Sequence, residues 1–141
     1  MFKLSSKSQL KLALVHPDLK LVVEEAIKIT TVDFAVIEGL RTLNRQRELV
    51  AAGASRTMNS RHLHGLAVDL AALVGGKITW QPPVYNQIAE AMLTAAAKLQ
   101  IPIVWGGGWL SFPDLVHFEL SRKFYPDNEL LTKGENHAIP T

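Results

Sequence analysis

The stretch SRHLHGLAVDL, residues 60–70, decides the fold and chemistry of this chain. It holds two potential metal ligands, His62 and Asp69, on either side of Gly65. Side chains alternate along a strand, and these two stand an odd number of residues apart. On one unbroken strand they would therefore point to opposite faces. Gly65 allows the chain to turn between them, since glycine adopts positive φ at little cost. Residues 66–70 then form a short buried strand that carries one carboxylate.

Asp69 is surrounded by alanine, valine and leucine, where an unpaired carboxylate is costly to bury. A bound cation offsets the cost of burying such a carboxylate. In the alternative interpretation an arginine pairs with Asp69 and His62 lies on the surface, and this stretch favours neither. His64 is a rival ligand, because His62 and His64 on one strand would share a face.

A second stretch, WGGGWLSFPDLVHFEL at residues 105–120, supplies the other half of the site. Asp114 and His117 stand three residues apart and follow Pro113, which does not fit inside a central strand. The sequence therefore predicts a strand that begins after Pro113 and leaves Asp114 at its mouth. Two histidines and one carboxylate form an open zinc site whose fourth position is left to water.

Together, SxHxxGxAxD and DxxH in a WGGxW…HFEL context resemble the zinc D-alanyl-D-alanine peptidases. The closest branch is the L-alanyl-D-glutamate endopeptidases of phage endolysins. The resemblance implies an α+β fold with a small antiparallel sheet, the zinc on one sheet face and helices packed behind. It assigns zinc to His62, Asp69 and His117 and leaves His64 at the pocket rim. A D,D-carboxypeptidase and a zinc-binding module without catalysis are the alternative functions.

The resemblance also implies the catalytic base. The family's base precedes the metal-binding histidine by three residues, which assigns the role to Asp114, and the aspartate here agrees with the endopeptidases, whereas carboxypeptidases have glutamate. Zinc lowers the pKa of a bound water towards about 7. Glu119 shares a strand face with His117, so it is either a rival base or a partner that orients the imidazole ring.

Substrate contacts are expected from the two segments beside these motifs. The phrase EGLRTLNRQ, residues 38–46, resembles the family's GxR…Q segment, which assigns substrate binding to Arg41. Without the resemblance, Arg41 is an arginine paired with Glu38 or solvated at a helix end. Ser60 either binds substrate or fixes the turn. Three aromatic residues either wall the cleft or belong to the core: Trp105, Trp109 and Phe112.

Composition narrows the class of protein. The 141 residues fit a single domain, residues 1–141, and the absence of cysteine excludes disulfides and thiolate metal sites. A net charge of +2 is far below that of a nucleic-acid binder. No signal peptide or transmembrane stretch is recognised, so we expect a protein that is made in the cytoplasm without stable membrane association. We also expect a monomer. The resemblance implies an endolysin that cleaves peptidoglycan stem peptides after a holin opens the membrane.

The remaining elements follow from periodicity and turn residues. We expect a helix capped by Ser5 or Ser6, and helices over residues 19–27, 43–52 (capped by Thr42) and 85–99. We expect strands over residues 33–39, 77–80 and 101–105, with a hairpin at residues 75–76. Residues 106–108, all glycine, suit close approach by a substrate peptide. His16 and His137 are predicted to be ordinary surface residues.

Overall fold

A computed structural model describes residues 1–55 and 57–127 of the chain. Four α-helices, two 3₁₀ turns and five strands follow one another along these residues. In chain order they are α1 (Ser6–Leu12), α2 (Pro17–Ile29), β1 (Asp33–Glu38), α3 (Leu43–Ala51), η1 (Arg61–His64), β2 (Ala67–Val74), β3 (Lys77–Thr79), α4 (Pro82–Leu99), β4 (Ile103–Trp105), η2 (Gly106–Gly108) and β5 (His117–Leu120).

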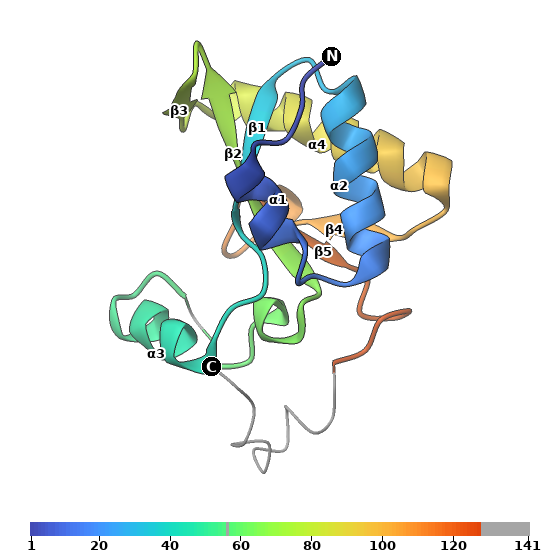
Figure 1. Cartoon of the computed structure of the whole chain (residues 1–141). Coiled ribbons are helices and arrows are strands. Elements are labelled where there is room, and N and C mark those ends of the chain that lie inside the picture. Colours follow the sequence, from blue (N-terminus) through green and yellow to red (C-terminus); the bar gives the residue numbers. More distant parts are fainter. Residues whose placement is uncertain (56, 128–141) are drawn as a thin grey trace.

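The five strands form one antiparallel sheet. Its order is β1-β2-β5-β4, and β3 pairs with the outer part of β2. Figure 1 shows α1, α2 and α4 gathered beside the sheet, while α3 stands apart at the end where η1 lies. The predicted α+β fold with a small antiparallel sheet is confirmed.

Alternation along β2 and β5 divides core from site. Val68 and Leu70 of β2, with Phe118 and Leu120 of β5, belong to the hydrophobic core shared with α1, α2 and α4. Because strand side chains alternate, the residues next to them point to the other sheet face. Those residues include Asp69, His117 and Glu119, which the helices leave free for chemistry.

Gly65 turns the chain between η1 and β2, as predicted. Its φ is +68°, and its N–H donates to the carbonyls of Arg61 and His62. A Cβ at this position would lie 3.2 Å from the carbonyl oxygen of Leu14, so space as well as φ favours glycine. The odd spacing of the two ligands is thereby resolved, because His62 lies on a 3₁₀ turn and only Asp69 on the strand.

Helix starts follow the capping residues of the sequence. Ser5 and Thr42 accept hydrogen bonds from the backbone at the starts of α1 and α3, as predicted. His16 caps α2, with Nδ1 accepting from the N–H of Asp18, and its ring packs edge-on against Tyr125. It is therefore a capping residue and not an ordinary surface histidine. His137 lies outside the described residues.

Several boundaries differ from the predicted ones. β5 begins at His117 and not directly after Pro113, because a turn intervenes in which the N–H of His117 donates to the carbonyl of Asp114. α4 begins at Pro82, since prolines are tolerated in a first helical turn. β2 continues to Val74, and β4 begins only at Ile103.

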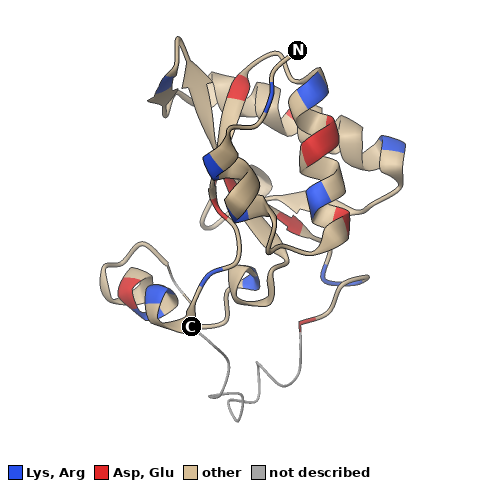
Figure 2. Ribbon diagram, viewed as in Figure 1, with Lys and Arg blue, Asp and Glu red and all other residues tan. Residues whose placement is uncertain are grey.

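Charged side chains of both signs lie along α2. Lysines alternate with acidic residues along α2 in Figure 2, so the helix presents no continuous basic face. Among the residues that the structure describes, no helix has both the length and the apolarity needed to cross a membrane.

Candidate metal centre

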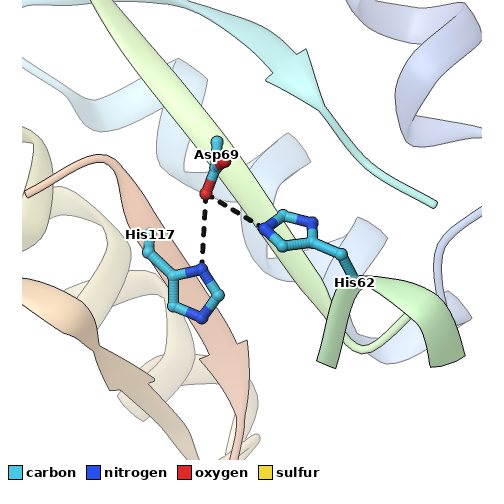
Figure 3. A group of neighbouring side chains, drawn as sticks. All are labelled: His62, Asp69 and His117. Carbon is cyan, nitrogen blue, oxygen red and sulfur yellow. Dashed lines mark hydrogen bonds and ion pairs between the residues drawn. The ribbon is translucent and has the colours of Figure 1, made fainter. Parts of the chain in front are cut away.

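Two strands and a 3₁₀ turn bring the three predicted ligand side chains together. Asp69 on β2 and His117 on β5 are direct cross-strand partners, and η1 carries His62 beside them. One donor atom from each of the three residues lies within 4.8 Å of the others, and all three residues are buried. Figure 3 shows both imidazole rings directed at the carboxylate. The structure thus assembles the three predicted ligands.

A single oxygen of Asp69 lies between the two rings. Its Oδ1 is 3.1 Å from Nε2 of His62 and 3.3 Å from Nδ1 of His117. Burial acts to raise the pKa of Asp69, but hydrogen bonds from His117 and His62 outweigh it and hold that pKa well below its usual range. Burial acts to lower the pKa of His117, but hydrogen bonds to Asp69 and Glu119 outweigh it and raise that pKa to about 9. The carboxylate is therefore ionised, as a metal ligand must be.

The outer nitrogen of each ring is held by its own acceptor. Nδ1 of His62 lies 2.9 Å from the carbonyl oxygen of Gly39, and Nε2 of His117 lies 2.8 Å from Oε1 of Glu119. An N–H directed at each acceptor leaves the inner nitrogen to bind a metal. Two oriented imidazoles and a carboxylate match the ligand set of open zinc sites. The residues present therefore fit a zinc ion.

Asp114 lines the same cavity, which has a volume of about 330 Å³. Burial, and then the negative charge of Asp69, raises the pKa of Asp114 above its ordinary value. The N–H of Asp114 donates to the carbonyl of Gly106 at 2.9 Å. A Cβ on Gly106 would lie 2.6 Å from the carbonyl oxygen of Asp114 and 3.1 Å from the Cβ of His117, so only glycine fits this contact.

Arg41 also lines the cavity and has four polar neighbours. Its Nε donates to Glu38 at 2.7 Å, and one terminal nitrogen donates to Gln46 at 2.8 Å and to Ser60 at 3.3 Å. The other terminal nitrogen is 3.5 Å from Oδ2 of Asp69. The guanidinium is thus paired with Glu38, as one of the two interpretations has it, and also lies near Asp69; substrate binding by Arg41 stays a prediction.

Residues 1–130 match the family of phage L-alanyl-D-glutamate peptidases. The chain belongs to this family. It is 30% identical over 128 residues to the L-alanyl-D-glutamate peptidase of Escherichia phage T5, a match that covers 88% of this chain and 93% of that protein. An L-alanyl-D-glutamate peptidase from a Listeria phage is 33% identical over 94 residues, which are 67% of this chain and 32% of that protein.

A solved structure supports the same family. The crystal structure of Serratia marcescens L-Ala D-Glu endopeptidase ChiX matches with a TM-score of 0.83 and 43% sequence identity. The match covers 88% of this chain and 94% of that one. The fold of the L-alanyl-D-glutamate peptidases therefore extends over most of the described chain.

Within this peptidase fold, the other histidine and the acidic residue of the motifs have separate contacts. His64 is not in the three-residue metal group, and its Nε2 lies 3.3 Å from Oδ1 of Asn59. Glu119 contacts the outer nitrogen of His117, as expected for a partner that orients the ring. Ser60 caps η1 by accepting from the N–H of His62 at 3.2 Å, so it does fix the turn.

The three aromatic residues divide between the two predicted alternatives, and the glycine prediction holds only in part. Trp109 and Phe112 line the cavity, whereas Trp105 stacks on Phe118 and donates its indole N–H to the carbonyl of Leu115. Gly107 is covered by the Trp105 ring, and Gly106 packs against Asp114. The glycine tract therefore serves internal packing more than approach by substrate, because only Gly108 faces open space.

Two residues at the peptidase site were missed in the sequence. Gln46 is fully buried, accepts from Arg41 and donates to Ser55 at 2.8 Å. Arg61 is also fully buried and contacts Glu119. The phrase GxR…Q contained a signal for Gln46. The only signal for Arg61 in the sequence was its position next to the predicted ligand His62. That position does not distinguish a solvated arginine from a buried one.

Proposed function

We propose that this chain is a zinc peptidase that hydrolyses the bond between L-alanine and D-glutamate in the stem peptide of peptidoglycan. The observation that carries the proposal is the convergence of His62, Asp69 and His117 beside Asp114 in one cavity. Membership of the L-alanyl-D-glutamate peptidase family gives the substrate class. The protein is accordingly a cell-wall hydrolase of the endolysin type.

His62, through Nε2, and His117, through Nδ1, would hold a zinc ion together with the carboxylate of Asp69. When bound, a zinc ion supplies a Lewis acid and acidifies water at neutral pH. The hydrogen bonds to Gly39 and Glu119 support these nitrogen assignments, because each fixes the outer side of a ring. The protein's contribution is therefore a pre-oriented ligand set on a rigid sheet.

Asp114 is the general base of the proposed reaction. Its carboxylate takes a proton from the attacking water and returns it to the amine that leaves when the peptide bond breaks. Burial and the charge of Asp69 raise its pKa, which brings the carboxylate closer to the pH at which it must both accept and donate a proton. Such a role is worth on the order of a hundred- to ten-thousand-fold in rate.

Arg41 and Ser60, which line the same cavity, bind the substrate. Glu38 and Gln46 hold the guanidinium of Arg41 so that a terminal nitrogen faces the site. A fixed guanidinium stabilises negative charge that develops on the carbonyl oxygen of the scissile bond. Ser60 accepts hydrogen bonds from His62 and Arg41, which leaves its own hydroxyl hydrogen available to a substrate acceptor.

The biological setting is proposed from the family. The enzyme acts as a monomer on the cell wall, and it reaches that wall from the cytoplasm of the producing cell when a holin permeabilises the membrane. Trp109 and Phe112 form an apolar side of the cavity, against which the alanine side of the stem peptide packs.

Digestion of purified peptidoglycan tests the function directly. The proposal predicts new amino termini on D-glutamate and new carboxyl termini on L-alanine, released only when zinc is present. Release of terminal D-alanine instead would show a D,D-carboxypeptidase. Zinc binding without any cleavage would show an interaction module that lacks catalysis.

A further inference from the structure

Arg61 is a fully buried cation that no step of the proposed reaction uses. Its side chain is 1% exposed, although arginine is seldom buried without strong partners. One terminal nitrogen donates to Asp127 at 2.7 Å, and the other donates to the carbonyl of Leu120 at 2.6 Å. Its Nε is 3.4 Å from Oε2 of Glu119 and has no hydrogen bond within the described part of the chain.

These contacts connect Arg61 to both histidine ligands. Arg61 immediately precedes His62 in η1, so its backbone belongs to the turn that carries the first histidine. Its side chain reaches β5, where it contacts Glu119, and Oε1 of Glu119 is 2.8 Å from Nε2 of His117. The Arg61 side chain thus extends from η1, which carries His62, to Glu119, which orients His117.

We propose that Arg61 is a positioning residue for the metal centre. It fixes the carboxylate of Glu119, and Glu119 in turn holds His117 with Nδ1 directed at Asp69. The inference rests on the proposed metal site. Since a histidine ligand is oriented by the acceptor on its other nitrogen, loss of that acceptor or of its support loosens the ligand.

Burial favours this role over a purely structural ion pair. A buried guanidinium is costly to desolvate, and its pairing is weak evidence for a stability function. Glu119 also lies 3.7 Å from Nε of Arg122, but Arg122 is 59% exposed, where water and salt screen the attraction. Only Arg61 therefore holds the carboxylate from a desolvated position, with its planar group anchored at two further points.

The two arginines provide a matched experiment. Zinc dissociation constants are measured by chelator competition for the wild type, Arg61→Lys, Glu119→Gln, their double variant and Arg122→Lys. We expect Glu119→Gln to weaken zinc binding by about 10- to 100-fold. Arg61→Lys should weaken it several-fold, and Arg122→Lys should not change it. Because Arg61 acts through Glu119, the double variant should match Glu119→Gln alone.

Two further measurements separate positioning from folding. The visible absorption spectrum of the cobalt-substituted protein reports ligand geometry and should change in Arg61→Lys and not in Arg122→Lys. Thermal unfolding of the metal-free proteins reports the stability of the fold by itself. If Arg61→Lys fails to fold, unchanged zinc affinity in Glu119→Gln still overturns the positioning role, because the Arg61 side chain is connected to His117 through Glu119.

Unchanged zinc affinity and an unchanged cobalt spectrum in Arg61→Lys, with reduced stability of the metal-free protein, would overturn the positioning role and leave the proposed function standing. Unchanged zinc affinity in Glu119→Gln would overturn it as well. Failure of the wild type to bind zinc at all would instead refute the proposed function.

Discussion

Asp69 and His117 face each other across the antiparallel pair β2–β5, and Oδ1 of the aspartate is 3.3 Å from Nδ1 of the histidine. Cross-strand register therefore sets the relationship between these two ligands. A slip of one residue would move either side chain to the core face, which is filled by Val68 and Phe118. The same hydrophobic alternation that builds the core thus positions two residues of the proposed metal site.

One zinc ion per chain is the first expected result. The ¹⁵N spectrum of the zinc-loaded protein should show the metal on Nε2 of His62 and on Nδ1 of His117, because the other nitrogens are held by Gly39 and Glu119. Ligand distances in a zinc-soaked crystal should be about 2.0–2.2 Å. Metal bound at His64, or a stronger preference for iron in metal analysis, would refute the assignment.

The metal-free protein should lose stability as pH rises above neutrality. Folding raises the pKa of His117 from 6.5 to about 9, so its contribution is complete below pH 6.5 and is lost as pH rises through about 9. Urea unfolding of the chelator-treated chain between pH 6.5 and 9 checks this trend. His117→Ala is the control and should remove most of the slope. A midpoint that rises with pH would contradict the assignment.

The affinity of the protein for zinc should increase as pH rises over the same window. A metal bound to His117 must displace its proton, so competition weakens as pH increases towards about 9. Chelator competition at several pH values measures the effect. An affinity independent of pH would show that His117 is not protonated in the metal-free site.

Arg41→Ala should lower turnover on wall fragments by on the order of a hundred-fold, as loss of an oxyanion-stabilising group does. Zinc content should stay near the wild-type value, because Arg41 is not a ligand. Arg45→Ala is the matched control, since Arg45 also lies near Glu38, at 3.7 Å, but is 52% exposed. Kinetics equal to those of the control variant would show that Arg41 only forms a structural ion pair with Glu38.

Gly106→Ala should destabilise the protein by about 1–3 kcal/mol, the usual range for overpacking. Its new methyl group would collide with the carbonyl of Asp114 and crowd His117, so peptidase activity should fall together with stability. Gly108→Ala is the control because a Cβ there meets open space. Denaturant unfolding of both variants compares them, and equal stabilities would show that the Gly106 contact is unimportant.

The strands were predicted from side-chain alternation and turn residues. The choice of His62, Asp69 and His117 as ligands rested on the family resemblance, because the residues alone left His64 and an arginine partner for Asp69 as alternatives. The predicted start of β5 was wrong because Leu115 and Val116 are apolar like strand residues, whereas the hydrogen bond from the N–H of His117 to the carbonyl of Asp114 shows that they lie in a turn.

The surroundings of the ligands were less predictable. Whether Arg61 is buried depends on β5 and Asp127, which are distant in the chain, and local patterns carry no such information. The same holds for Trp105, whose ring could equally have lined the cavity or covered Gly107. Non-local packing therefore determined which of several plausible residues support the site.

Asp114→Asn tests the central claim most directly, through zinc content and wall lysis measured on the same preparation. Asparagine is nearly isosteric with aspartate but does not accept a proton from water at neutral pH. We expect about one zinc per chain, as in the first prediction, and a lysis rate lowered at least about a hundred-fold. Glu119→Gln, measured at saturating zinc, should retain far more activity. Near-normal lysis by Asp114→Asn, with activity abolished in Glu119→Gln, would contradict the account and make Glu119 the base.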